Sequence, residues 1–94
     1  MNRYELTLIL EGKASVAKKK KLIDKIEKII KELRGKIVGH EDWGEKEFRY
    51  PIKKKDTGIY LFFELELESK AAKDLLPKLK LEEEILRYLL VRKD

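Results

Sequence analysis

The strongest constraint on the fold is the alternating pattern of residues 43–67, WGEKEFRYPIKKKDTGIYLFFELEL. From residue 59 onward, every second side chain is apolar: Ile59, Leu61, Phe63, Leu65 and Leu67. The positions between them carry rings and charges: Tyr60, Phe62, Glu64 and Glu66. Successive side chains of a strand point to opposite faces, so we expect the aliphatic face to be buried. The other face is expected to remain available for binding.

The segment before this strand predicts its hairpin partner. Phe48, Tyr50 and Ile52 alternate with Glu47, Arg49 and Lys53, which is typical of a half-buried strand. Residues 53–58, KKKDTG, are expected to form a basic turn in which Gly58 is free to adopt a positive φ. Trp43 is expected to anchor packing at the start of the strand, and His40 to be a surface imidazole.

A strand and a helix are predicted ahead of the hairpin. Residues 3–10 alternate, with the side of Tyr4 and the leucines inward and the side of Arg3 and Ile9 outward. Residues 15–34 carry an apolar stripe at helical spacing, with Ser15 as a candidate N-cap and Gly35 as the stop. The lysines of this helix favour a solvated face over a phosphate-binding one.

The C-terminal part leaves two alternatives open. Residues 69–80 predict a second helix, capped by Ser69, which Pro77 either kinks or ends. Residues 81–94 read equally as a continued helix or as a turn followed by a strand over 85–92. The strand alternative gives the order β-α-β-β-α-β. That order is an α+β, ferredoxin-like sandwich, with two helices on one face of a four-stranded antiparallel sheet.

Length and charge restrict the class of protein. Ninety-four residues predict a single domain over 1–94. There is no cysteine for disulfides or thiolate metal sites, and no apolar run approaches the ~20 residues of a membrane span. A soluble cytoplasmic protein is the simplest interpretation. The formal net charge of +5 suggests a polyanionic partner, although a solvated surface of mixed charge explains it as well.

Catalysis is not expected. His40 is the sole histidine, and both serines lie at predicted helix caps, so no nucleophile–base pair is present. There is no glycine-rich phosphate loop, and no cofactor, metal or small-molecule substrate is expected. Small acyl-phosphate hydrolases share this fold but carry an arginine in the loop after the first strand. The corresponding segment here, EGKAS, has none.

Binding is better supported. Arginines fall in the predicted strands at positions 3, 49, 87 and 92, and Lys53, Lys54 and Lys55 cluster at the hairpin tip. Arginine binds phosphate bidentately, and aromatic rings stack on unpaired bases. Tyr60 and Phe62 are candidates for the open face, where contact with a protein is at least as well supported as base stacking.

Three stretches carry a resemblance to a known family: RYE near the start, EDWGEKEFRYPIKKKDTGIY in the middle and ILRYLLVRK near the end. Together with the order of elements, they are similar to bacterial small-subunit ribosomal protein six over residues 2–93. The combination of Trp43-Gly44, Tyr50-Pro51-Ile52, Gly58 with Tyr60, and Leu86-Arg87 makes the resemblance specific.

The resemblance implies a ferredoxin-like fold with a C-terminal strand, no catalysis, and a cytoplasmic place on the ribosome. It also implies binding to the central domain of small-subunit ribosomal RNA, jointly with small-subunit protein eighteen as a heterodimer. Carried over by matching positions, Arg3, Tyr4 and Arg87 become candidates for RNA contact. Lys53, Lys54 and Lys55 join them on charge alone. Ile9, Tyr60 and Phe62 are expected to form exposed apolar sheet surface that the partner protein covers.

Two points qualify this expectation. Many family members carry a charged tail after the last strand, so a tail-dependent role is not expected of a chain that ends at Asp94. The alternative from a different class is an interaction module that self-associates through its open sheet face or an edge strand, without nucleic acid.

Overall fold

The structure is a computed structural model that describes residues 1–13, 16–52 and 55–93. Its elements are β1 (Asn2–Glu11), α1 (Val16–Glu32), β2 (Lys36–Ile52), β3 (Lys55–Leu67), α2 (Ser69–Lys80) and β4 (Ile85–Arg92). This order confirms the ferredoxin-like prediction. The ambiguous C-terminal segment is a strand.

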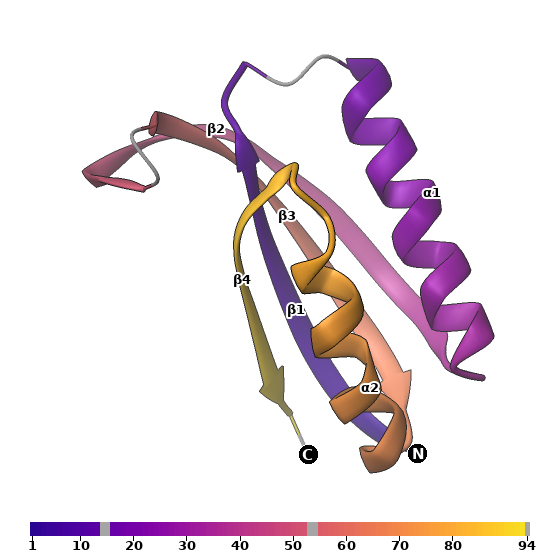
Figure 1. The fold of residues 1–94 in the computed structure, drawn as a ribbon. Coiled ribbons are helices and arrows are strands. Elements are labelled where there is room, and N and C mark those ends of the chain that lie inside the picture. Colours follow the sequence, from indigo (N-terminus) through magenta and orange to yellow (C-terminus); the bar gives the residue numbers. More distant parts are fainter. Residues whose placement is uncertain (14–15, 53–54, 94) are drawn as a thin grey trace.

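The strands form one antiparallel sheet in the order β2-β3-β1-β4, with both helices on the same side (Figure 1). The core lies between this side of the sheet and the helices. It contains the predicted aliphatic faces of β1 and β3, and it is closed by Leu22, Ile26 and Ile30 of α1 and by Leu75 and Leu79 of α2. The period-two and period-3.6 patterns therefore identified the buried faces correctly.

Helix α1 ends close to the predicted stop, but through a different residue. The N–H of Gly35 donates to the carbonyl of Ile30 at 2.9 Å, and that of Arg34 donates to Lys31 at 3.0 Å, which is the Schellman pattern. The left-handed residue is Arg34, with φ 60°. Gly35 is required for space, because a Cβ there would lie 2.7 Å from the carbonyl oxygen of Glu66. Ser15, the predicted N-cap, is outside the described residues.

Helix α2 begins without the predicted serine cap. Glu68 is the N-cap residue and makes no side-chain cap hydrogen bond, while Ser69 is already helical. The Ser69 hydroxyl instead accepts a hydrogen bond from Asn2 Nδ2 at 2.7 Å, which ties the helix to the start of β1. The helix continues through Pro77 to Lys80. Pro77 leaves the carbonyl of Lys73 without its helical donor, and both residues are exposed to water.

The hairpin differs from its prediction. Strand β3 starts at Lys55, so residues 55–58 are strand and not turn, and Gly58 does not have a positive φ. Phe48 is half-buried, but Tyr50 is exposed. The reason is that β1 stops pairing at Glu11, opposite Gly58, so that among the described residues no third strand lies beside the far end of the hairpin. Lys53 and Lys54 lie outside the described residues.

Candidate protein and nucleic-acid interface

The side of the sheet away from the helices, here called the open face, is built by the register of three strands. Ile9, Thr7 and Glu5 of β1 lie opposite Tyr60, Phe62 and Glu64 of β3. On the other side of β1, the same three residues lie opposite Arg87, Leu89 and Val91 of β4. Paired residues in an antiparallel ladder share a face, so these nine side chains form three rows across the sheet.

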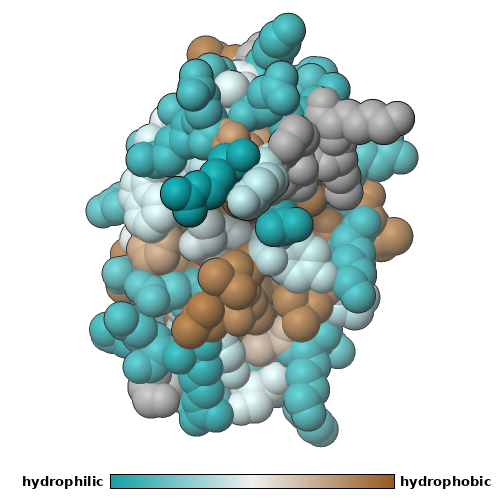
Figure 2. Space-filling view, turned by 90° about the vertical axis from the view of Figure 1, so that its left-hand side faces the viewer, coloured by the Kyte–Doolittle hydropathy of each residue, from teal (hydrophilic) through white to brown (hydrophobic). Residues whose placement is uncertain are grey.

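Apolar side chains gather in the middle of this face. The apolar patch consists of Ile9, Trp43, Phe48, Tyr60, Phe62, Leu89 and Val91. Trp43 stacks on Phe62 with a centroid distance of 5.0 Å, and Phe48 meets Tyr60 edge-on at 6.4 Å. Figure 2, viewed from the side opposite α1, shows apolar atoms near the centre with hydrophilic atoms around them.

A bulge in β2 places Trp43 in the patch. Asp42 pairs with Leu61 and Gly44 pairs with Tyr60, so Trp43 is an extra residue between two paired positions. Trp43 lies within β2, not at its start, and 46% of it is exposed. The expectation that it anchors packing at the start of the strand is therefore wrong. Its indole N–H donates to Glu41 Oε2 at 2.7 Å.

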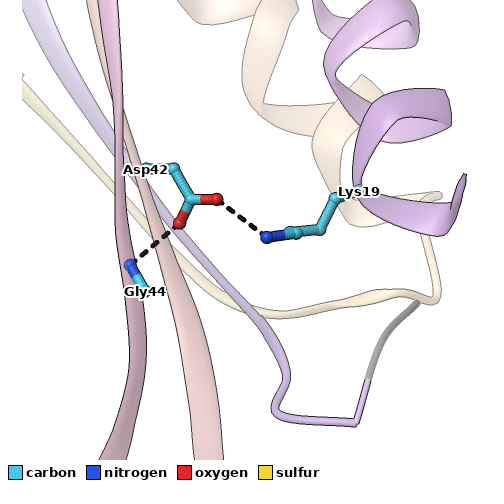
Figure 3. A network of polar contacts seen from close by, with 3 residues as sticks. All are labelled: Lys19, Asp42 and Gly44. Carbon is cyan, nitrogen blue, oxygen red and sulfur yellow. Dashed lines mark hydrogen bonds and ion pairs between the residues drawn. The ribbon is translucent and has the colours of Figure 1, made fainter. Parts of the chain in front are cut away.

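Asp42 stabilises the bulge from the helix side. Its Oδ1 accepts a hydrogen bond from the Gly44 N–H at 2.8 Å, and its Oδ2 accepts one from Lys19 Nζ of α1, also at 2.8 Å (Figure 3). The Lys19 bond first, and then the Gly44 bond, lower the pKa of the Asp42 carboxyl below its ordinary value. Gly44 has φ 80°, a conformation that glycine adopts without strain.

Ile9 is on the open face but is not exposed surface. A Cβ on Gly58 would lie 2.7 Å from Ile9 Cγ2 and would collide with the Phe48 ring, so both side chains pack over the bare backbone of Gly58. Ile9 is consequently only 9% exposed. The expectation that it offers exposed surface is wrong, whereas Tyr60 and Phe62 lie half-buried on this face. Trp43, Leu89 and Val91 were not predicted for it.

The two arginine candidates for RNA contact are on the open face but far apart. The Arg3 side chain is 64% exposed and lies 3.7 Å from Glu66. Arg87 is exposed and makes no ion pair with any residue that the structure describes. Because Arg87 lies opposite Ile9, six positions along β1 from Arg3, the two are separated by about 20 Å of strand.

The remaining RNA candidates are less accessible or undescribed. Tyr4 lies on the helix side of β1, is 8% exposed and belongs to the core, so its ring is not available for stacking. Lys55 pairs with Glu11 at 3.1 Å. Lys53 and Lys54 cannot be placed, being outside the described residues. RNA contact by any of these six residues stays a prediction.

The described part of the chain holds no candidate metal site. No three metal-ligating side chains gather among residues 1–13, 16–52 and 55–93. His40 is exposed and stacks near Phe63 at 5.9 Å, as expected of a surface imidazole. Over the same residues, none of the helices is long and apolar enough to cross a membrane.

The fold and this face define a class: a ferredoxin-like α+β protein that packs one side of its sheet against its two helices and leaves the other side open. Comparison with known proteins gives the family. The model of the family described as Ribosomal protein S6 matches residues 3–92 of this chain. The chain belongs to that family. The resemblance seen in the three sequence stretches is thereby confirmed.

Individual relatives agree over nearly the whole chain. Small ribosomal subunit protein bS6 of Pelagibacter ubique is 36% identical over 92 residues, which cover 98% of this chain and 76% of the relative. That of Porphyromonas gingivalis is 34% identical over 94 residues, covering 100% and 80%. The crystal structure of 30S ribosomal protein S6 from Thermotoga maritima superposes with a TM-score of 0.91 at 27% identity, covering 98% and 87%.

Family membership decides the broad role. The chain is a structural constituent of the small ribosomal subunit and not an enzyme. It therefore associates with the ribosome and its RNA, in the bacterial cytoplasm.

Proposed function

We propose that this chain binds the central domain of small-subunit ribosomal RNA jointly with small-subunit protein eighteen, and that the open face receives the protein partner. The observation that carries the proposal is the apolar patch. Both helices cover the other side of the sheet, while Leu89 is 61% exposed and Trp43 nearly half exposed. Contiguous exposed apolar surface of this kind is typical of an interaction site.

The aromatic contacts favour a protein over nucleotide bases in the patch. Base stacking requires the free face of a ring. One face of Phe62 is already taken by Trp43, and Tyr60 is met by Phe48 within the chain. A packed aromatic surface with aliphatic neighbours such as Leu89 is suited to the apolar core of a protein–protein interface.

RNA is assigned to the exposed cations at the borders of the open face. Arg87 is free of ion pairs with described residues, and Arg3 has only a long contact with Glu66. Two exposed guanidinium groups about 20 Å apart fit contacts with separate phosphates of a folded RNA. The mechanism is phosphate neutralisation and shape fit, with little base readout.

A binding titration tests this proposal. An RNA fragment of the central domain is titrated with the chain, with and without protein eighteen, at two salt concentrations. We expect protein eighteen to raise the affinity at least about ten-fold, and each phosphate contact to contribute a salt slope of about −0.7 to −0.9. Absence of binding in every condition would overturn the proposal.

Self-association through the same patch is the rival function. Sedimentation of the chain alone distinguishes it. A concentration-dependent dimer that persists in high salt and excludes protein eighteen would favour the rival, because burial of apolar surface is insensitive to screening. A monomer that forms a one-to-one complex with protein eighteen supports the joint-binding proposal.

A further inference from the structure

Glu64 differs from the three carboxylates that lie near it on the open face, Glu5, Glu41 and Glu66. Glu66 pairs with Arg3 at 3.7 Å, and Glu5 pairs with Lys93 at 3.6 Å. Glu41 accepts the hydrogen bond of the Trp43 indole. Glu64 makes no hydrogen bond or ion pair with any residue that the structure describes.

The cross-strand neighbour of Glu64 is also a carboxylate. Glu64 lies directly opposite Glu5 on the two central strands, and like charges opposite one another destabilise a sheet. The two carboxylates line a hollow together with Arg3, Val38 and Lys93. Although two cations border this hollow, their ion pairs are with Glu66 and Glu5.

The hollow adjoins the apolar patch. Phe62 is two positions from Glu64 along β3, and Val91 is the β4 neighbour of Glu5. Val38 adds an exposed aliphatic side chain at the β2 border. A side chain with an apolar stem and a cationic head would therefore find hydrophobic contact along Val38 and a carboxylate at the end.

We propose that Glu64 receives a cationic side chain, an arginine or a lysine, of the protein that docks on the open face. The inference rests on the proposed function and names the chemistry of the partner. Charge complementarity carries it, because a cation at Glu64 relieves the repulsion with Glu5 and supplies the absent ion pair. RNA is disfavoured at this point, since a phosphate here would meet two facing carboxylates.

The test is substitution of Glu64 by glutamine, which removes the charge and keeps the shape. The matched control is Glu27→Gln on α1, an exposed carboxylate on the helix side. Calorimetric titration with protein eighteen at two salt concentrations measures affinity, and thermal unfolding measures stability.

We expect Glu64→Gln to weaken binding about ten-fold or more and to reduce its salt dependence. Its melting temperature stays at or above wild type, because repulsion with Glu5 is lost. Glu27→Gln stays within about two-fold of wild-type affinity.

A charge-reversal series identifies the partner residue. Glu64→Arg is combined with single Lys→Glu and Arg→Glu variants of protein eighteen. Restoration of binding by one of these variants supports the inference and names the cation.

Three results would overturn it. Binding by Glu64→Gln within about two-fold of wild type shows that the charge is not used. If Glu64→Gln instead strengthens binding to the RNA fragment and leaves protein eighteen unaffected, the occupant is RNA. If wild type does not bind protein eighteen at all, the proposed joint binding fails first, and this inference fails with it. That case is recognised from the titration of wild type alone, before any Glu64 variant is compared with it.

Discussion

Gly44 determines where Trp43 lies. Its left-handed backbone, at φ 80°, allows the bulge that inserts Trp43 between two paired positions. Apart from Gly44 and its chain neighbours, no described residue has an atom within 4 Å of the place where a Cβ would be. Substitution by alanine therefore adds strain without a collision. We expect Gly44→Ala to lower the free energy of unfolding by about 1–2 kcal/mol. The bulge relaxes in response and disturbs the Trp43–Phe62 stack.

Gly39→Ala is the matched control. Gly39 also lies in β2, and a Cβ added there would have nothing within 4 Å, but its φ is not positive. Urea unfolding of both variants, followed by the fluorescence of Trp43, the sole tryptophan, measures the difference. Equal costs for the two substitutions would contradict a role for the left-handed conformation.

At the scale of elements, the hydrogen bond from Lys19 to Asp42 links α1 to the bulge of β2. It lowers the pKa of Asp42 from the ordinary value of 3.8, with a further contribution from the Gly44 N–H. The ionised form is thus favoured by folding. Its stabilising contribution is present above pH 3.8 and is lost as the pH falls through the lowered folded-state pKa. Both side chains are partly exposed, so the contribution is modest.

Asp42→Asn removes the charge and keeps the size. We expect it to lower the free energy of unfolding by about 1 kcal/mol at neutral pH. The difference from wild type shrinks as the pH falls below the ordinary carboxyl value. Denaturant unfolding across this pH range provides the measurement, with Glu47→Gln, an exposed carboxylate of the same strand, as the control. A difference that is undiminished in acid would show that the ionised carboxylate is not responsible.

At the scale of the whole molecule, the two proposed binding functions are assigned to different parts of one face. Phe62→Ala removes a ring from the apolar patch, and we expect it to weaken binding to protein eighteen while leaving RNA contacts intact. Arg87→Ala is expected to weaken binding to the RNA fragment while leaving the affinity for protein eighteen unchanged. It also makes the salt slope less negative by about 0.7–0.9, the value for one phosphate contact.

Lys28→Ala, an exposed cation of α1 on the helix side, controls for net charge. Each variant is titrated separately with the RNA fragment and with protein eighteen. If Phe62→Ala and Arg87→Ala lower the affinities for the RNA fragment and for protein eighteen in the same proportion, both ligands bind one shared surface and not two.

The local patterns of the chain were sufficient for the buried faces of β1, α1 and β3, while the C-terminal strand was implied only by the family resemblance. Alternation along residues 3–10 and 59–67 identified the buried faces, because successive strand side chains must point to opposite sides. The spacing of apolar residues in α1 likewise identified the buried face of that helix. The aromatic face of Tyr60 and Phe62 was predicted by the same rule, and three short stretches identified the family.

What only the tertiary structure decided is how residues distant in the sequence meet on that face. Register brings Leu89 and Val91 beside β1, the Gly44 bulge carries Trp43 onto Phe62, and Gly58 lets Phe48 cover Ile9. Alternation cannot predict these contacts. A bulge moves the side chains that follow it to the opposite face, and a glycine makes room for side chains that come from the neighbouring strands. The sequence by itself therefore determined which surface is open. The packing of the strands determined which side chains occupy it, and left Glu64 there without a partner among the residues that the structure describes.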